Sequence, residues 1–298
     1  MVPDAPDMPD MLFKGKVRDT YPGESEDELV VVASDRISVF DIVLPTEIPG
    51  KGKVLTHMTE HWLTDTPVAD IMPNHFLAGP GRCADTLPEW APEGRSTVVE
   101  KLEMLKIEAI VRGYLTGSGW KEYKVSGKVS GIELPVGAQE MERFPIPLFT
   151  PSTKADEGHD ENIDFERMER ILDSRRIAEE VRDRSLEIYK AGAQYALERG
   201  IILIDTKLEF GFTPGTNKLV LADEVLTPDS SRFTKVEDYS VGKPPVSMDK
   251  QFVRDHVLNE LGWDKTPPGP HLTAEVVEKT RDLFKEISLR LTGTSPID

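Results

Sequence analysis

The segment that follows Gly200 combines an apolar run with three charged side chains at alternating positions. Residues 201–204 are Ile, Ile, Leu and Ile, and Asp205, Lys207 and Glu209 come after them. Because side chains along a strand alternate between its faces, the two carboxylates and the amine are predicted to project from the same face. Carboxylates beside an amine are suited to holding a divalent cation and to stabilising a phosphoryl group during transfer.

A second apolar run, residues 219–222, lies beyond a Pro-Gly turn and predicts the return strand of a hairpin. With residues 213–217 as the loop, Glu209 pairs with Leu221, and Asp223 joins the charged face. Burying these charges without partners is costly, and Mg²⁺ held by Glu209 and Asp223 would remove that cost. The alternative is a solvated strand face with ordinary ion pairs.

Two further segments have the composition of phosphate sites. The segment 228–232, Pro-Asp-Ser-Ser-Arg, follows the hairpin directly and offers Ser231 and Arg232 to an oxyanion. Arg112 leaves a predicted strand, and Ser118 stands at a predicted helix start between glycines, where exposed backbone amides favour an anion. Alternatively, Ser118 only caps that helix.

The N-terminal part of the chain offers a candidate nucleotide site. Lys16 and Arg18 are predicted to share a strand face beside Gly15, and a hairpin of this kind could cover nucleotide phosphates. A basic edge strand explains the same residues equally well. Asp35 and Arg36 end the next predicted strand, a position where functional sites tend to lie.

Two other motifs give weaker signals. A long polar loop contains Lys154, His159 and Asp160, which are suited to substrate contacts, although most polar loops have no such role. His57 and His61 lie four residues apart in a predicted helix and match the H-x-x-E-H zinc pattern. This pattern is short and often arises by chance, so ordinary packed histidines are the default interpretation.

Composition narrows the class of protein. The chain has 298 residues and a net charge of −17, which argues against general binding to nucleic acid or an anionic membrane. Cys83 is the only cysteine, and no segment has the pattern of a signal peptide or a membrane span, so we expect a cytoplasmic location. In such an acidic chain, local clusters of Lys and Arg indicate anionic ligands.

The hydrophobic periodicity predicts mixed secondary structure. Helices are expected over 54–64, 164–172, 174–199, 249–261 and 273–291, and β-rich runs dominate before residue 115. We therefore expect an α+β or α/β chain with C-terminal helices that pack on its body.

Several blocks, taken together and in order, resemble the SAICAR synthetase (phosphoribosylaminoimidazole-succinocarboxamide synthase) family. They are GKVRD at 15–19, SDRISVFD at 34–41, VRGYLTGSGW at 111–120, TPSTKADEGHDENI at 150–163, DTKLEFG at 205–211 and LADEVLTPDSSRF at 221–233. No single block is decisive, but their combination is very specific.

The resemblance implies a reaction and a fold. It implies an ATP-dependent carboxylate–amine ligase that joins L-aspartate to the carboxylated aminoimidazole ribonucleotide and releases ADP and phosphate. It also implies a two-lobed fold that resembles ATP-grasp enzymes. The expected division is a β-rich lobe over ATP at 1–105, an α/β catalytic lobe at 106–248 and a helical segment at 249–298.

The resemblance also implies roles for particular residues. It assigns Lys16 and Arg18 to the ATP phosphates, places the adenine beside the connector 100–104, and assigns Glu209 and Asp223 to Mg²⁺. The connector residues are Glu100, Leu102 and Met104. The residues matching the ribonucleotide-phosphate cradle are Arg112, Ser118 and Arg232, and Ser231 beside them is also expected to bind substrate. Residues with less certain substrate roles are Asp35, Arg36, Lys154, His159 and Asp160.

The chemistry agrees with this residue set. A carboxylate becomes an acyl donor once ATP phosphorylates it, and positioning with charge neutralisation by Lys, Arg and Mg²⁺ then suffices. The expected catalytic residues are Lys207, which would stabilise the transferred phosphoryl group, with Asp205, Glu209 and Asp223. Asp35, His159 or Asp160 could accept the proton of the attacking amine. The alternatives are a small-molecule kinase, a zinc hydrolase and a non-catalytic nucleotide sensor. We expect a monomer or a small homo-oligomer.

Overall fold

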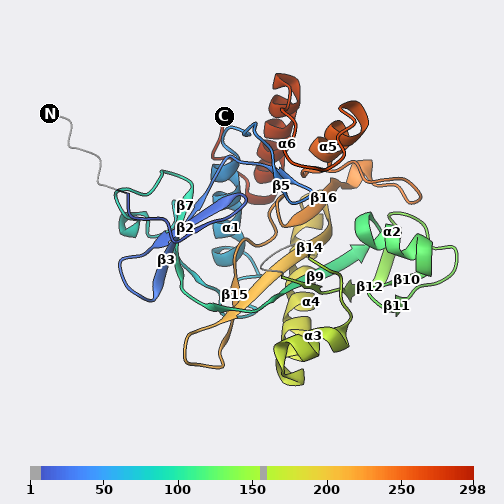
Figure 1. Cartoon of the computed structure of the whole chain (residues 1–298), viewed down its shortest axis with the longest axis horizontal. Coiled ribbons are helices and arrows are strands. Elements are labelled where there is room, and N and C mark those ends of the chain that lie inside the picture. The colour runs from blue at the N-terminus through green and yellow to red at the C-terminus, as the bar shows by residue number, and fades with distance from the viewer. Residues whose placement is uncertain (1–7, 155–159) are drawn as a thin grey trace.

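The structure is a computed structural model that describes residues 8–154 and 160–298, and it contains two main β-sheets flanked by helices (Figure 1). The N-terminal sheet is antiparallel with the strand order β1-β2-β3-β7-β6. Its strands are β1 (Phe13–Lys14), β2 (Arg18–Pro22), β3 (Glu28–Ala33), β7 (Ser96–Glu100) and β6 (Phe76–Ala78). Near it lies the short hairpin of β4 (Ser38–Val39) and β5 (Ile42–Val43).

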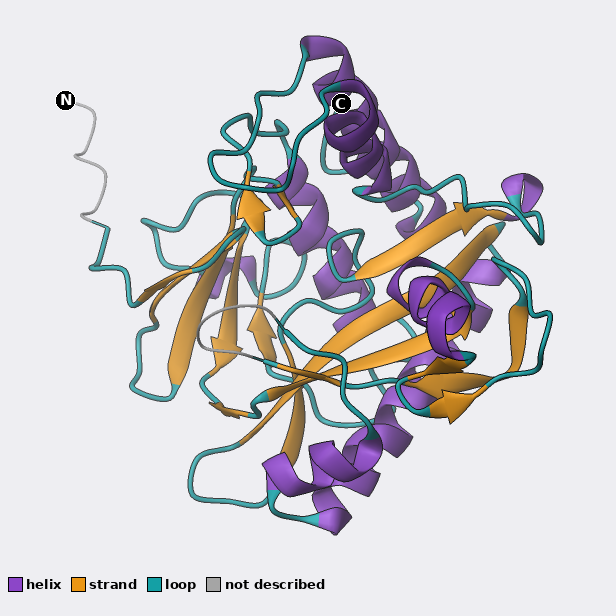
Figure 2. Cartoon of the chain, turned by 45° about the vertical axis from the view of Figure 1, so that its right-hand side comes forward, coloured by secondary structure: helices purple, strands orange, loops and turns teal. Residues whose placement is uncertain are grey.

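The second sheet has seven strands and is built around β14 (Ile201–Phe212). Figure 2 shows the long strands in orange crossing the middle of the molecule, with helices beside them. The other strands of this sheet are β8 (Glu103–Met104), β9 (Ile107–Tyr114), β12 (Arg143–Phe149), β13 (Ser152–Thr153), β15 (Leu219–Ala222) and β16 (Ser231–Lys235). A small hairpin, β10 (Lys128–Val129) with β11 (Ile132–Glu133), stands apart from it.

Helices cover these sheets. Their bounds are α1 (Lys51–Thr64), α2 (Gly117–Ser126), α3 (Phe165–Leu172), α4 (Arg175–Leu197), α5 (Gln251–Asp255) and α6 (Ala274–Thr292), with a π-helical turn at His256–Glu260 and 3-10 turns at Ala84–Thr86 and Val236–Asp238. Ser174 caps α4 by accepting a hydrogen bond from the backbone N–H of Ile177, and the left-handed Gly200 lies just beyond it, as predicted.

The largest hydrophobic core joins the two halves of the chain. Met58 and Trp62 of α1 belong to the same buried cluster as Ile188 of α4 and as Leu208 and Phe210 of β14. A separate cluster packs the β4–β5 hairpin against the C-terminal helices. The N-terminal and C-terminal segments are therefore both fixed to the central sheet by apolar contacts, which positions the side chains between them.

Strand β14 buries the same face along its length, but the alternation of its residues shifts partway along it. Ile201 and Leu203 belong to the main core, and so do Leu208 and Phe210, although strict alternation would place these two pairs on opposite faces. The register of the β14–β16 pair shifts between Leu203 and Asp205. This bulge adds one residue, so Asp205, Lys207 and Glu209 emerge together on the face away from α4.

The hairpin loop is one residue longer than predicted. Phe212 pairs with Leu219 and Glu209 with Ala222, so the predicted pairing of Glu209 with Leu221 is wrong. The hydroxyl of Thr216 donates to the Thr213 carbonyl and accepts the backbone N–H of Lys218, which stabilises a loop spanning 213–218. The longer loop is stabilised by hydrogen bonds of a threonine side chain, and the sequence prediction considered only the Pro-Gly turn signal.

The predicted strand face shared by Lys16 and Arg18 is also wrong. Lys16 lies in the turn between β1 and β2, and only Arg18 is in a strand. The backbone N–H of Gly15 donates to the Arg18 carbonyl at 2.7 Å, and a Cβ at Gly15 would lie 2.5 Å from that oxygen. Gly15 is therefore required by the tightness of this turn.

Candidate active site

The charged face of β14 holds a lysine between carboxylates. Lys207 Nζ lies 2.6 Å from Glu108 Oε1 and 3.2 Å from Glu209 Oε1, and Lys154 forms an ion pair with Glu209. Burial disfavours the charged lysine, but Glu209 and Glu108 outweigh it and raise the pKa of Lys207 above its ordinary value. Glu108 was missed by sequence reasoning, because only the pairing of β9 with β14 places it here.

Asp223 also lies at the charged face of β14, but the regular strand alternation does not place it there. Its φ is 57°, so the chain leaves the strand alternation just after β15 and turns the side chain toward Glu209. Burial and the nearby Glu209 raise the pKa of Asp223 to about 6. The pKa of Glu209 is lowered, because Lys207 and Lys154 outweigh the effect of its own burial. The side chain of Asp223 keeps 32% exposure, so solvent reaches this carboxylate.

These two carboxylates are suited to a cation that also binds phosphate. Within residues 8–154 and 160–298, no three or more His, Cys, Asp or Glu side chains form a metal-binding group. Mg²⁺ typically takes one or two protein carboxylates and completes its shell with water and substrate phosphates. The raised pKa of Asp223 reflects its burial and then the negative charge of Glu209, and a bound cation would oppose both effects.

Two arginines share one carboxylate farther along β14. Arg112 Nη1 lies 3.4 Å from Asp205 Oδ2, while Arg232 donates to both carboxylate oxygens of Asp205. Arg112 also donates to Ser118 Oγ at 3.1 Å and to Thr150 Oγ1 at 3.0 Å. The three strands β9, β14 and β16 therefore bring Arg112, Asp205 and Arg232 together, and α2 adds Ser118.

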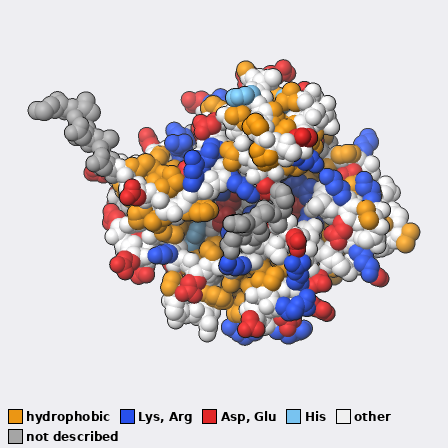
Figure 3. Space-filling model, viewed as in Figure 1, with side chains coloured by type: hydrophobic (Ala, Val, Ile, Leu, Met, Phe, Trp, Pro, Cys, Tyr) orange, Lys and Arg blue, Asp and Glu red, His pale blue; other side chains and the backbone are white. Residues whose placement is uncertain are grey.

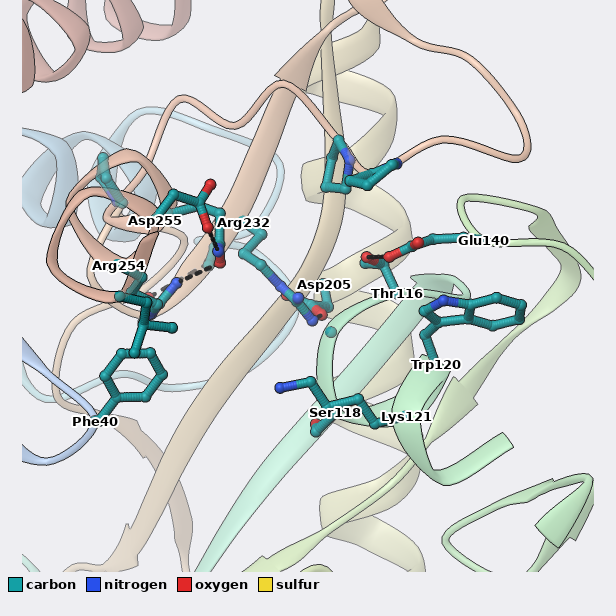
Figure 4. Close-up of a pocket in the computed structure, with 18 of the residues that line it drawn as sticks. Phe40, Thr116, Ser118, Trp120, Lys121, Glu140, Asp205, Arg232, Arg254 and Asp255 are labelled. Carbon is teal, nitrogen blue, oxygen red and sulfur yellow. Dashed lines mark hydrogen bonds and ion pairs between the residues drawn. The ribbon is translucent and has the colours of Figure 1, made fainter. Parts of the chain in front are cut away.

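A cavity of about 640 Å³ opens over this group. In Figure 4, Ser118 and Lys121 of α2 extend toward the Arg232–Asp205 pair, and Phe40 and Arg254 stand on the opposite side. Figure 3 shows several Lys and Arg side chains near the middle of the face that it presents. Lys121 and Arg254 were missed by sequence reasoning, since neither lies in a motif and their helices meet only in the fold.

The contacts of Ser231 and the N-cap of α2 differ from the sequence predictions. The hydroxyl of Ser231 donates to Thr206 Oγ1 at 2.8 Å and is buried, although Ser231 also lines the cavity. The N-cap residue of α2 is Thr116, so Ser118 is not the cap and its hydroxyl accepts a hydrogen bond from Arg112 instead.

The basic and polar residues of the N-terminal lobe are engaged with protein groups. Arg18 Nη2 lies 2.5 Å from Glu224 Oε2 and its Nη1 lies 3.9 Å from Asp223. Lys16 Nζ lies 2.5 Å from Asp41 at an exposed position. Arg18 therefore stands beside Asp223, one of the two Mg²⁺ candidates, whereas Lys16 lies in the turn that precedes β2 and contacts Asp41.

The Asp35–Arg36 block is also engaged with the chain itself. Both carboxylate oxygens of Asp35 accept backbone N–H groups, from Gly50 and Gly52 at the start of α1. The guanidinium of Arg36 donates to both oxygens of Asp19 and to the carbonyls of Gly15 and Lys16. These contacts hold the β1–β2 turn and the N-terminus of α1.

The connector between the sheets runs beside the β14–β15 hairpin. Glu100 Oε1 accepts the hydroxyl of Thr213 at 2.6 Å, and Met104 in β8 pairs with Gly211. A Cβ at Gly211 would lie 2.8 Å from the Cβ of Leu102, so Leu102 packs closely on the hairpin. Met104 remains 42% exposed and offers an apolar surface.

The polar loop is described only in part. Lys154 reaches Glu209, and Asp160 is exposed, whereas His159 lies outside the described residues.

The two histidines of the zinc motif bind different partners. His57 Nε2 lies 3.0 Å from Thr292 Oγ1, and His61 Nε2 lies 2.8 Å from the Tyr195 hydroxyl. They tie α1 to α6 and α4, and burial lowers the pKa of both. The part of the chain that the structure describes contains no metal-binding group that includes them.

The α+β fold has two lobes and a cavity lined by basic and acidic side chains. These features are typical of an enzyme that binds phosphorylated anions. The SAICAR synthetase profile matches residues 11–270. The phosphoribosylaminoimidazole-succinocarboxamide synthase of Thermodesulfovibrio yellowstonii is 51% identical over 289 residues, which cover 95% of both chains. That of Neisseria meningitidis serogroup C is 50% identical over 287 residues, covering 94% of this chain and 96% of the relative. The chain belongs to the SAICAR synthetase family.

Solved structures agree. The SAICAR synthase from Saccharomyces cerevisiae complexed with SAICAR superposes with a TM-score of 0.85, at 37% identity, over 99% of this chain and 97% of that one. A SAICAR synthetase in complex with ADP shares the fold at 24% identity, with a TM-score of 0.71 over 97% of this chain and 100% of that one. The predicted family, two-lobed fold and ligase activity are confirmed, and the kinase alternative is not favoured. In the described residues no helix is long and apolar enough to cross a membrane.

Proposed function

We propose that the chain uses ATP to join L-aspartate to the carboxylate of 5-amino-1-(5-phospho-D-ribosyl)imidazole-4-carboxylate, giving SAICAR, ADP and phosphate in purine biosynthesis. The observation that carries this proposal is the single face of β14 that presents both Asp205, with its two arginines, and the Lys207–Glu209 pair. One face can thus hold a phosphorylated substrate near a nucleotide and its cation.

The substrate phosphate is assigned to the arginine end of that face. Arg112, Ser118 and Arg232 converge there and supply guanidinium and hydroxyl donors suited to phosphate. The phosphate would replace part of the hydrogen bonding that Asp205 now gives the arginines. Lys121 and Arg254 add positive charge on the walls of the cavity.

The ATP phosphates and Mg²⁺ are assigned to the other end. Glu209 and Asp223 would hold Mg²⁺, which when bound neutralises phosphate charge. Arg18 stands beside Asp223, and Arg18 and Lys16 would contact the ATP phosphates. The adenine would lie by the connector with Glu100, Leu102 and Met104. Lys207, kept protonated by its two carboxylates, would stabilise the transferred phosphoryl group.

The proposed chemistry has two steps. Phosphorylation of the substrate carboxylate gives an acyl phosphate, and the amine of aspartate then attacks its carbonyl carbon and expels phosphate. Asp35 uses both carboxylate oxygens on backbone N–H groups, which favours His159 or Asp160 as the acceptor of the amine proton.

We further propose the functional division into an ATP-covering lobe at 1–105, a catalytic lobe at 106–248 and a helical segment at 249–298. A cytoplasmic location and a monomer or small homo-oligomer complete the proposal.

The deciding experiment measures ADP release from Mg-ATP and the ribonucleotide, with and without L-aspartate. We expect aspartate-dependent release and a product with the mass of the amide. Release without aspartate would support a small-molecule kinase, and ATP binding with no turnover would support a nucleotide sensor.

Site assignment is tested by Arg232→Ala, with Arg176→Ala on the exposed face of α4 as the matched control. We expect Arg232→Ala to raise KM for the ribonucleotide more than KM for ATP. The reverse pattern would move the phosphate cradle elsewhere.

A further inference from the structure

A fully buried lysine at the start of α1 reaches the segment that carries Arg232. Lys51 Nζ lies 2.6 Å from Asp229 Oδ2, and the two side chains are 0% and 1% exposed. Lys250 Nζ lies 3.5 Å from Asp229 Oδ1, an oxygen that has no hydrogen-bond partner among the described residues. Lys51 is therefore the principal partner of this carboxylate.

Asp229 lies in a tight turn that leads into β16. The hydroxyl oxygen of Thr227 accepts the backbone N–H groups of Asp229 and Ser230, at 3.2 and 3.4 Å. The backbone N–H of Ser231 donates to the Thr227 carbonyl at 2.8 Å, and the Ser230 carbonyl accepts the N–H of Lys207. A displacement of Asp229 would thus be transmitted to Ser231 and to Arg232 directly after it.

The other end of the contact is fixed by the N-terminal lobe. Asp35 holds the backbone N–H groups of Gly50 and Gly52 on either side of Lys51, at 3.0 and 2.9 Å. A Cβ at Gly52 would lie 2.4 Å from the Ala33 carbonyl oxygen, so the start of α1 packs directly on the end of β3. Lys51 consequently extends from a well-anchored position in one lobe to the turn in the other.

Burial acts on both members of the pair, and it lowers the pKa of Lys51. Burial would raise the pKa of Asp229, but Lys250 and Lys51 lower it well below its ordinary value. Without Lys51 the buried Asp229 would keep only Lys250, which lies 3.5 Å away and makes no hydrogen bond to it, and the usual relief for an undercompensated buried charge is movement toward water. For Asp229 that movement would shift the turn 227–231.

We propose that Lys51 is a positioning residue for the ligase reaction: through Asp229 it fixes the turn 227–231, and thereby places Arg232 in the substrate cavity. This inference rests on the proposed assignment of that cavity to the ribonucleotide. Residues 50–53 are Gly, Lys, Gly and Lys. The proposal gives the first of these two lysines a structural role in the site, because its side chain is fully buried and no ligand can reach it.

The test compares Lys51→Met with Lys53→Met, a substitution of the same type in the same helix at a lysine outside the Asp229 cluster. Lys51→Met is expected to raise KM for the ribonucleotide about tenfold, equivalent to about 1.4 kcal/mol, with a smaller change in KM for ATP. Lys53→Met is expected to leave both constants close to those of the parent. Equal changes in the two KM values of Lys51→Met would overturn the proposal.

A double-mutant cycle tests the route through Asp229. If Lys51 acts through this carboxylate, the combination of Lys51→Met with Asp229→Asn should be no worse for the ribonucleotide KM than the more damaging single variant. Effects that multiply would refute that route. Should Lys51→Met fail to fold, Asp229→Asn alone must show the same selective rise in KM, and an unchanged KM would refute the proposal.

The outcome for Arg232→Ala separates this inference from the assignment of the cavity. If Arg232→Ala leaves the ribonucleotide KM unchanged, the cavity assignment fails. If Arg232→Ala raises it and Lys51→Met does not, only the role of Lys51 fails.

Discussion

Replacing Asp205 by Asn should destabilise the empty protein and increase its response to phosphate. Asp205 is 6% exposed and is the shared counterion of Arg112, which is 4% exposed, and of Arg232. Loss of one partner from a buried ion pair costs about 3–5 kcal/mol, and we expect about 3 kcal/mol because Asn keeps one oxygen acceptor. With an unfolding entropy of about 2.1 cal/mol/K per residue, that corresponds to a fall in Tm of about 5 °C for a chain of 298 residues.

Phosphate should offset part of this loss, because an anion bound between Arg112 and Arg232 replaces the missing carboxylate. Thermal melts in increasing inorganic phosphate should show a larger rise in Tm for Asp205→Asn than for the parent, through linkage of binding to folding. Glu179→Gln, which breaks an exposed ion pair with Arg175, is the control and should change stability by less than about 1 kcal/mol. A loss below about 1 kcal/mol in Asp205→Asn, or equal phosphate responses, would refute the reasoning.

Three further outcomes are expected. Asp223→Ala should abolish turnover with little loss of folded protein. The same variant should lose any Mg²⁺-dependent rise in Tm that the parent shows. Near-normal turnover would show that the metal is held elsewhere. Burial lowers the pKa of His75 to about 4, so the folded state favours the neutral ring, and stability should fall by about 3 kcal/mol as the pH drops from about 6.5 to 4. Urea denaturation across that range should show a shallower fall for His75→Gln, and equal slopes would contradict the assignment. Metal analysis of the purified chain should find no stoichiometric zinc, and His57→Ala should leave turnover intact; zinc that disappears in this variant would revive the hydrolase alternative.

Local sequence signals predicted the long helix α4 and the existence of the central hairpin, although not the pairing of its strands. Ser174 and Gly200 delimit α4 because a side-chain acceptor and a left-handed glycine act on the nearest backbone groups. The alternation at Asp205, Lys207 and Glu209 likewise depends only on strand geometry within a few residues. In each case the interaction that determines the structure joins residues only a few positions apart in the sequence.

The partners of charged residues could not be predicted in this way. Arg18 contacts Glu224 across 206 residues of sequence, and Lys51 contacts Asp229 across 178. Such pairs depend on how the two sheets approach one another, and no local periodicity encodes that approach. Asp223 shows the limit most clearly: it reaches Glu209 although the predicted register was wrong, because a left-handed residue turns the chain.

The mutual pairing of charges in the cleft has a consequence for ligand discrimination. Arg112 and Arg232 already hold Asp205, and Lys207 already holds Glu108 and Glu209, before any ligand arrives. A small monovalent anion gains little by competing with a preorganised carboxylate, whereas a ligand with a doubly charged phosphate and further contacts along the cavity gains more than the carboxylate supplied. The cleft is therefore expected to remain free of chloride and similar ions at cellular concentrations, and to respond mainly to phosphorylated molecules.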